Sequence, residues 1–146
     1  MVLNDAYNAS PDAVAAALRA LAALPASGRH VAVLGAMREL GPQAHKEHER
    51  MGRLAGELGA DVVLALGDDA RAVAEGARAS GVAVVVVCAD AEDAVGWLER
   101  ELAPGDAVLV KASRAVGLER VAHALGVPDA REPDAGDGDE DDEVDG

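Results

Sequence analysis

Aromatic side chains are nearly absent from this chain of 146 residues. Tyr7 and Trp97 are the only two, and there is no phenylalanine. Modules that bind single-stranded nucleic acid stack the bases on aromatic side chains, so the composition argues against such a module. Since apolar residues still make up 50% of the chain, we expect a core of Ala, Val and Leu.

Cysteine is equally scarce. The single thiol, Cys88, excludes an internal disulfide and any metal site built from several cysteines. It lies within an apolar run, which favours a buried, unreactive thiol over a nucleophile. A reducing cytoplasm is the expected location.

Positive charge is limited: 13 basic residues face 27 acidic ones, for a net charge of −14. Such a chain repels phosphate backbones, so we expect no nucleic-acid partner. Ten of the acidic residues lie in 129–146, a segment almost without apolar residues. This composition cannot offset the entropy cost of ordering. The sequence therefore predicts one folded domain at 1–128 and a disordered acidic tail at 129–146.

Long apolar runs are also missing. The longest, 82–89, has eight residues, whereas a membrane-spanning helix needs about 20. The first residues show neither the basic nor the apolar region of a signal peptide. We therefore expect no contact with a membrane.

Short valine-rich runs alternate with helical patterns along the chain. Runs that are apolar at every position are typical of strands covered on both faces. The expected strands are 1–3, 30–34, 62–66, 82–88 and 107–110. The expected helices begin after Ser10, at Pro42, after Asp68 or Asp69, after Asp90 and near 115, with Gly28 and Gly59 as stop signals for the first two. This order predicts an α/β fold, a Rossmann-like three-layer sandwich with a mostly parallel sheet of five to six strands and helices on both faces.

Ligands of open α/β sheets bind beyond the carboxyl ends of the strands. The loop after the first expected strand carries Asp5, Tyr7 and Asn8 before a helix. An Asn side chain matches the donor and acceptor of an adenine edge, and a carboxylate accepts from ribose hydroxyls. Spacing alone slightly favours a local role, in which Asn8 and Ser10 form turn and cap hydrogen bonds and Tyr7 is half-buried.

The loop after the second expected strand holds Arg38 and Glu39 between two glycines, a pattern typical of a solvated loop with a weak ion pair. His45 and His48 follow on the expected helix. Their spacing suits a shared metal ion, but no third ligand accompanies them. We expect no metal site and a hydrogen-bonded imidazole at His48. The loops at 67–69 and 89–90 are short, and helix capping by their aspartates explains them.

The loop after the last expected strand is basic. Lys111, Ser113 and Arg114 precede a helix N-terminus, whose N–H groups favour anions. Arg also holds a carboxylate through two hydrogen bonds. In a chain of net negative charge, this cluster predicts capture of a carboxylate or phosphate.

Three segments together resemble the C-terminal domain of the Mur ligases. Residues 5–11 (DAYNASP) are similar to D-x-Y-N-A-N-P, 33–41 (VLGAMRELG) to V-L-G-D-M-x-E-L-G, and 110–119 (VKASRAVGLE) to V-K-G-S-R-x-M-G-L-E. They occur in the family's order and spacing and span residues 2 to about 125. Ala36 stands where the family usually has Asp, Ala112 stands where it has Gly, and Ala115 also replaces the usual family residue.

The resemblance implies an ATP-dependent, amide-forming ligase, closest to the family member that adds D-Ala-D-Ala to UDP-MurNAc-tripeptide through an acyl phosphate. ATP with Mg²⁺ would be held mainly by a central ATPase domain. This chain would close over that domain and over an N-terminal domain. It has no Gly-x-x-x-x-Gly-Lys-Ser/Thr loop, so alone it is expected to be inactive and to hold no catalytic residue.

The same resemblance implies the roles of individual residues. It assigns the ATP side to Asp5, Tyr7 and Asn8, the incoming dipeptide to Lys111, Ser113 and Arg114, and loop contacts to Arg38, Glu39 and His48.

Other functions remain open at this point. The chain fits the same domain of another Mur ligase or of a folylpolyglutamate-synthetase-like enzyme. A stand-alone flavodoxin-like or receiver module would explain Lys111, but Gly67 stands where a receiver needs its phosphoacceptor Asp. A pure interaction protein would use the acidic tail to recruit basic partners.

Overall fold

The computed structural model describes residues 2–4 and 10–111. Several predictions fall outside the described residues: the roles of Asp5, Tyr7, Asn8, Ser113 and Arg114, the helix expected near 115–125, and the acidic tail at 129–146.

A parallel sheet of five strands organises the described residues, in the order β1-β5-β2-β3-β4. The strands are β1 (Val2–Asn4), β2 (His30–Leu34), β3 (Val62–Ala65), β4 (Val84–Val87) and β5 (Ala107–Lys111). The helices are α1 (Pro11–Ala23), the 3₁₀ helix η1 (Gly41–Gln43), α2 (Ala44–Glu57), α3 (Ala70–Ala79) and α4 (Ala91–Glu101). The predicted strand and helix order is confirmed for these elements.

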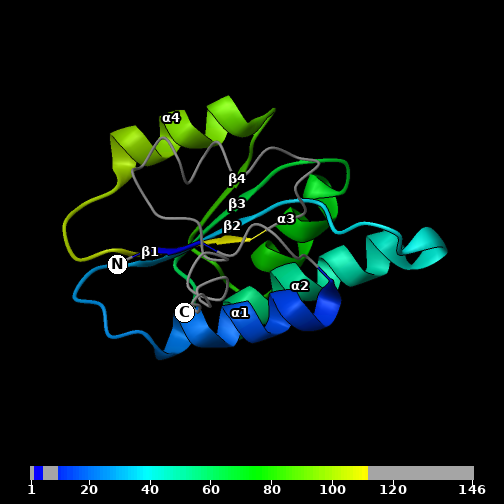
Figure 1. Cartoon of the computed structure of the whole chain (residues 1–146), viewed down its shortest axis with the longest axis horizontal. Coiled ribbons are helices and arrows are strands. Elements are labelled where there is room, and N and C mark those ends of the chain that lie inside the picture. The colour runs from blue at the N-terminus through cyan, green and yellow to red at the C-terminus, as the bar shows by residue number, and fades with distance from the viewer. Residues whose placement is uncertain (1, 5–9, 112–146) are drawn as a thin grey trace, which may run out of the picture.

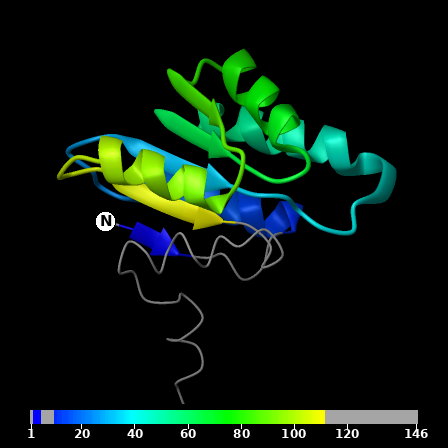
Figure 2. The same ribbon diagram turned by 90° about the horizontal axis from the view of Figure 1, so that it is seen from above.

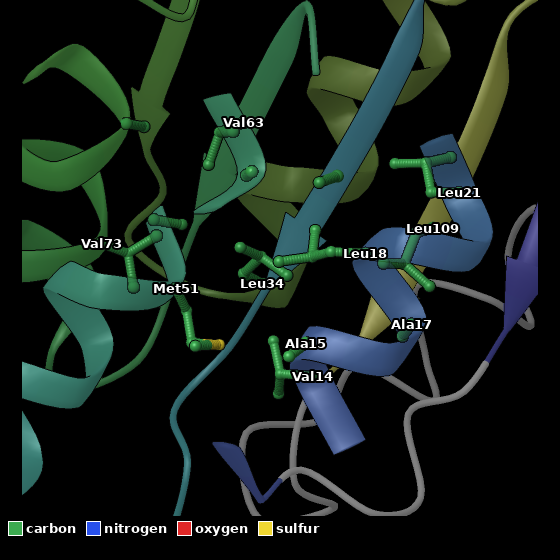
Figure 3. Packing of buried hydrophobic residues seen from close by; sticks show 14 of the residues in the cluster. Val14, Ala15, Ala17, Leu18, Leu21, Leu34, Met51, Val63, Val73 and Leu109 are labelled. Carbon is green, nitrogen blue, oxygen red and sulfur yellow. The ribbon is translucent and has the colours of Figure 1, made fainter. Parts of the chain in front are cut away.

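Helices cover both faces of the sheet, as predicted. Helices α1, α2 and α3 lie on one face and α4 on the other (Figure 1). Because strand side chains alternate between faces, Ala32 and Leu34 pack toward α1–α3, whereas Val31 and Val33 pack toward α4. Figure 3 shows the buried cluster between the sheet and helices α1–α3, which contains only aliphatic side chains and methionines. The expected α/β class with a three-layer arrangement is confirmed.

Helix α1 begins where the sequence indicates but ends earlier. The Ser10 hydroxyl accepts a hydrogen bond from the N–H of Ala13 at 3.2 Å, and Pro11 is the first helical residue. The helix ends at Ala23, so the stop signal predicted at Gly28 is wrong. Pro25 explains the difference, because the residue before a proline avoids the helical conformation.

The two aspartates expected to cap α3 and α4 behave differently. Asp90 accepts from the N–H of Asp93 at 2.9 Å and caps α4 as predicted. Asp69 precedes α3 but makes no capping hydrogen bond with its side chain, so the capping role expected there is wrong. Its carboxylate instead faces α2, as described below.

At the amino edge of the sheet, Asp106 ties β5 to β2. Its carboxylate accepts from the backbone N–H of Arg29 at 2.8 Å and of Ala103 at 2.9 Å, and from the Arg29 guanidinium at 3.2 Å. Gly28 fits beside it, because a Cβ there would meet Asp106 Oδ1 at 2.3 Å. Burial alone raises the pKa of Asp106, but these donors outweigh it and hold the pKa below its ordinary value of 3.8.

Candidate functional site

The carboxyl ends of all five strands meet at one edge of the sheet. In the strand register, Leu34 of β2 lies beside both Lys111 of β5 and Ala65 of β3. Asn4, the last residue of β1, lies beside Val110. Because β1 and β5 are parallel neighbours, their last residues, Asn4 and Lys111, lie at adjacent points of this edge.

Lys111 ends β5 at this edge and is buried, with an exposed fraction of 1%. Its backbone carbonyl accepts from the N–H of Gly35 at 3.0 Å, which joins the start of the loop after β2 to the end of β5. Lysines are rarely buried without a partner for the ammonium group. Because Lys111 is buried, the ligand contact predicted for it requires a movement that exposes its ammonium group.

The loop between β2 and η1 is divided into a buried and an exposed half. Ala36 and Met37 are buried, each 6% exposed, whereas Arg38 and Glu39 are exposed. No salt bridge joins these two side chains, contrary to the ion pair expected from their spacing. Glu39 has a φ of 64°, which is costly for a residue with a Cβ and rare outside turns and functional loops.

His48 anchors this loop from α2. The ring is 1% exposed; Nε2 accepts from the N–H of Met37 at 2.8 Å, and Nδ1 donates to the carbonyl of Ala44 at 2.6 Å. The hydrogen-bond network thus assigns the neutral tautomer with the proton on Nδ1. The hydrogen-bonded imidazole predicted from the sequence is confirmed, and the ring is not open to a ligand.

Asp69, from the loop after β3, completes this arrangement. One carboxylate oxygen lies 3.6 Å from Nδ1 of His48. No spacing rule predicts this contact, because Asp69 lies in the loop before α3 whereas His48 lies on α2. His45 lies at the surface, 3.6 Å from Glu75, so the two histidines are not paired. The described residues contain no group of three or more His, Cys, Asp or Glu placed to hold a metal ion.

Cys88 follows β4, and its N–H donates to the carbonyl of Ala65 at 2.7 Å. The residue is 4% exposed. Burial, assisted by Asp93 and Asp90, raises the pKa of the thiol to about 11. The buried, unreactive thiol expected from the sequence agrees with this environment.

Within the described ranges, none of the helices is both long and apolar enough to cross a bilayer.

Comparisons with known proteins match this chain to characterised sequences. The family "Mur ligase, glutamate ligase domain" matches residues 1–114. UDP-N-acetylmuramoyl-tripeptide–D-alanyl-D-alanine ligase of Mycobacterium tuberculosis H37Rv is 45% identical over 85% of the chain and 28% of the relative. The Escherichia coli K12 protein of the same name is 35% identical over 86% of the chain and 26% of the relative.

Solved structures of two MurF proteins also superpose on this chain. The MurF ligase of Thermotoga maritima in complex with ADP superposes with a TM-score of 0.68 at 34% identity, covering 85% of this chain and 28% of that one. MurF of Acinetobacter baumannii gives a TM-score of 0.70 at 28% identity, with the same coverage. The chain thus spans a little over a quarter of the length of the relatives it matches.

Proposed function

The chain belongs to the Mur ligase family through its glutamate ligase domain, and from that premise we propose that it is the C-terminal, substrate- and nucleotide-closing domain of a ligase that adds D-Ala-D-Ala to UDP-MurNAc-tripeptide. The relatives named above carry this activity in their names and align with most of the chain. Such a ligase contributes to peptidoglycan synthesis and would work in the cytoplasm, where ATP is available.

One structural observation carries the proposal: β1 and β5 are parallel neighbours at the carboxyl edge. Asp5, Tyr7 and Asn8 follow one of these strands directly, and Ser113 and Arg114 follow the other. The two strands that precede the groups assigned to ATP and to the dipeptide therefore end at adjacent points of one edge. This is the placement required for both to border a single cleft, and opposite edges would have excluded it.

ATP with Mg²⁺ would supply the phosphoryl group that activates the tripeptide carboxylate. The sequence has no phosphate-binding loop, and the described residues form no cluster of metal ligands, so we assign the phosphates and the metal mainly to a central domain. The residues of this chain would contact the adenosine side and the incoming dipeptide.

This division of labour gives the domain a positioning role. Arg114 would hold the dipeptide carboxylate through two hydrogen bonds, which orients the amine for attack. Closure of the domain would exclude water from the activated carboxylate. His48 would act indirectly, by fixing the loop that carries Arg38 and Glu39. Without the central domain, the chain is expected to have no ligase turnover.

A domain exchange tests the proposal. Residues 1–146 replace the matching region of the M. tuberculosis ligase, and formation of the amide product is measured with ATP, UDP-MurNAc-tripeptide and D-Ala-D-Ala. We expect turnover by the chimaera and none by the chain alone. A folded chimaera that prefers a different amino acid or dipeptide would contradict the proposed substrate.

Single substitutions in that chimaera separate the two groups of residues. Arg114→Ala is expected to raise the KM for D-Ala-D-Ala, because it removes a charged hydrogen-bond donor. Asn8→Ala is expected to raise the KM for ATP, because it removes a paired hydrogen-bonding group. Each increase should be about tenfold or more. Arg71→Ala, an exposed residue of α3, serves as the matched control. If Arg114→Ala leaves the KM for the dipeptide unchanged, Arg114 does not belong to the site.

A further inference from the structure

Within the described residues, the free edge of β4 is apolar and uncovered. Among the described strands, β4 pairs only with β3, and Figure 2 shows it at the rim of the sheet opposite β1. Val84 and Val87, 36% and 42% exposed, are the exposed large hydrophobic residues of the described chain. The whole run 82–89 contains neither a charge nor a proline.

The backbone of this edge offers unpaired hydrogen-bonding groups. The N–H groups of Val84 and Cys88 donate toward β3, to the carbonyls of Asp61 at 3.2 Å and Ala65 at 2.7 Å. Because successive residues of a strand point their N–H and C=O groups in opposite directions, those of Val85 and Val87 face away from β3. Proteins usually protect such an edge with charges, proline, a bulge or a covering element. The residues of β4 themselves supply neither a charge nor a proline.

Charges of opposite sign flank the two ends of β4. Arg78, in the last turn of α3, precedes the strand; it is exposed and forms no salt bridge among the described residues. Asp90 and Asp93 follow the strand and are exposed. A second β4 added in parallel would bring like charges together at both ends. An antiparallel one would bring the basic end of each copy to the acidic end of the other, which is the favourable arrangement.

We infer that β4 is a self-association edge, which pairs antiparallel with β4 of a second copy of this chain across a two-fold axis. This pairing satisfies the outward groups of Val85 and Val87, covers Val84 and Val87, and joins the two sheets into one. Since the same surface is used on both copies, the assembly closes at two subunits. The inference does not depend on the proposed ligase activity.

Two substitutions at one position test the antiparallel arrangement. Ala83 is exposed and lies directly before β4, so antiparallel pairing brings it near Asp90 of the second copy. Sedimentation equilibrium over a range of concentrations gives the dimer dissociation constant. We expect tighter association for Ala83→Lys and weaker association for Ala83→Glu, with the two constants roughly tenfold apart because two such pairs form per dimer.

A second matched pair controls for total charge. Arg78→Glu and Arg19→Glu alter the net charge equally at exposed positions, but Arg78 lies in the last turn of the helix that leads into β4, whereas Arg19 lies on α1, which packs against β5 and β2. The first variant is expected to weaken the dimer and the second to leave it unchanged. Amide exchange at Val85 and Val87 should also slow as the concentration of the chain rises.

Three results would overturn the inference. The first is a chain that remains monomeric at its highest soluble concentration. The second is equal association of the Ala83→Lys and Ala83→Glu variants. The third is protection of the Val85 and Val87 amides only when the remaining domains of a ligase are joined to the chain. The last result would assign the edge to a contact between domains of one polypeptide.

Discussion

The backbone N–H of Met37 donates to Nε2 of His48 across 2.8 Å, and this bond connects the loop after β2 to the second turn of α2. The other ring nitrogen donates to Ala44 within α2. A single buried imidazole therefore satisfies one donor and one acceptor of the main chain, and holds the exposed residues Arg38 and Glu39 at the carboxyl edge of the sheet.

Replacement of His48 is expected to destabilise the protein. His48→Ala leaves the buried N–H of Met37 without an acceptor and opens a cavity, which together cost about 2–4 kcal/mol. His48→Gln should recover part of the loss, because its side-chain carbonyl reaches the same N–H. Urea denaturation measures these differences. His45→Ala, at an exposed position of the same helix, should change stability little, and equal losses for the two alanine variants would contradict the anchoring role.

The contact between α2 and α3 depends on two glycines. A Cβ at Gly52 would lie 2.0 Å from the carbonyl oxygen of Val73, and a Cβ at Gly76 would lie 2.0 Å from that of Glu49. Gly52→Ala must therefore push the helices apart and is expected to cost roughly 1–3 kcal/mol.

Gly96 in α4 provides the opposite case for comparison. A Cβ there would meet only the flexible end of the Arg100 side chain at 3.1 Å. Gly96→Ala should raise stability by about 0.5–1 kcal/mol through helix propensity. Thermal unfolding of both variants checks the pair, and a stabilised Gly52→Ala variant would refute the close packing of α2 and α3.

Asp106 should stabilise the fold in a pH-dependent manner. Its pKa in the folded protein is lowered from 3.8, so its ionised form stabilises the fold above that value, and the contribution is lost as the pH falls through the folded pKa. Asp106→Asn is expected to cost about 2 kcal/mol near neutral pH, because it removes charge-assisted hydrogen bonds. The difference from the original protein should shrink below about pH 4. Glu99→Gln, at an exposed position of α4, serves as the control for the loss of one carboxylate.

Cys88 should resist alkylation in the folded protein. With a pKa of about 11, roughly one thiol in a thousand is ionised at pH 8, and burial blocks access as well. Iodoacetamide labelling followed by mass spectrometry should be slow for the native chain and fast in denaturant. Labelling of the native chain at the rate of the denatured one would show that the thiol is accessible.

The sequence by itself determined the kinds of element and much of their local chemistry. Continuous apolar runs specified strands covered on both faces, and 30–34 agrees with β2 residue for residue. Ser10 and Asp90 capped the expected helices, because a cap depends on neighbours only three residues away. The motifs at both ends of the domain also indicated the family that the comparisons then showed.

Only the tertiary structure decided which distant segments meet. Nothing local places β5 between β1 and β2, yet this insertion brings Asn4 and Lys111, the last residues of β1 and β5, to adjacent points of one edge. Asp69 is a residue type that commonly caps helices, but the packing of α3 on α2 turns its carboxylate toward His48. The exposure of the valines of β4 follows from their place at the rim of the sheet, since the same residues in a central strand would have been buried. Local sequence patterns encode hydrogen bonds between residues a turn or two apart. The contacts described here depend instead on the order of the strands within the sheet.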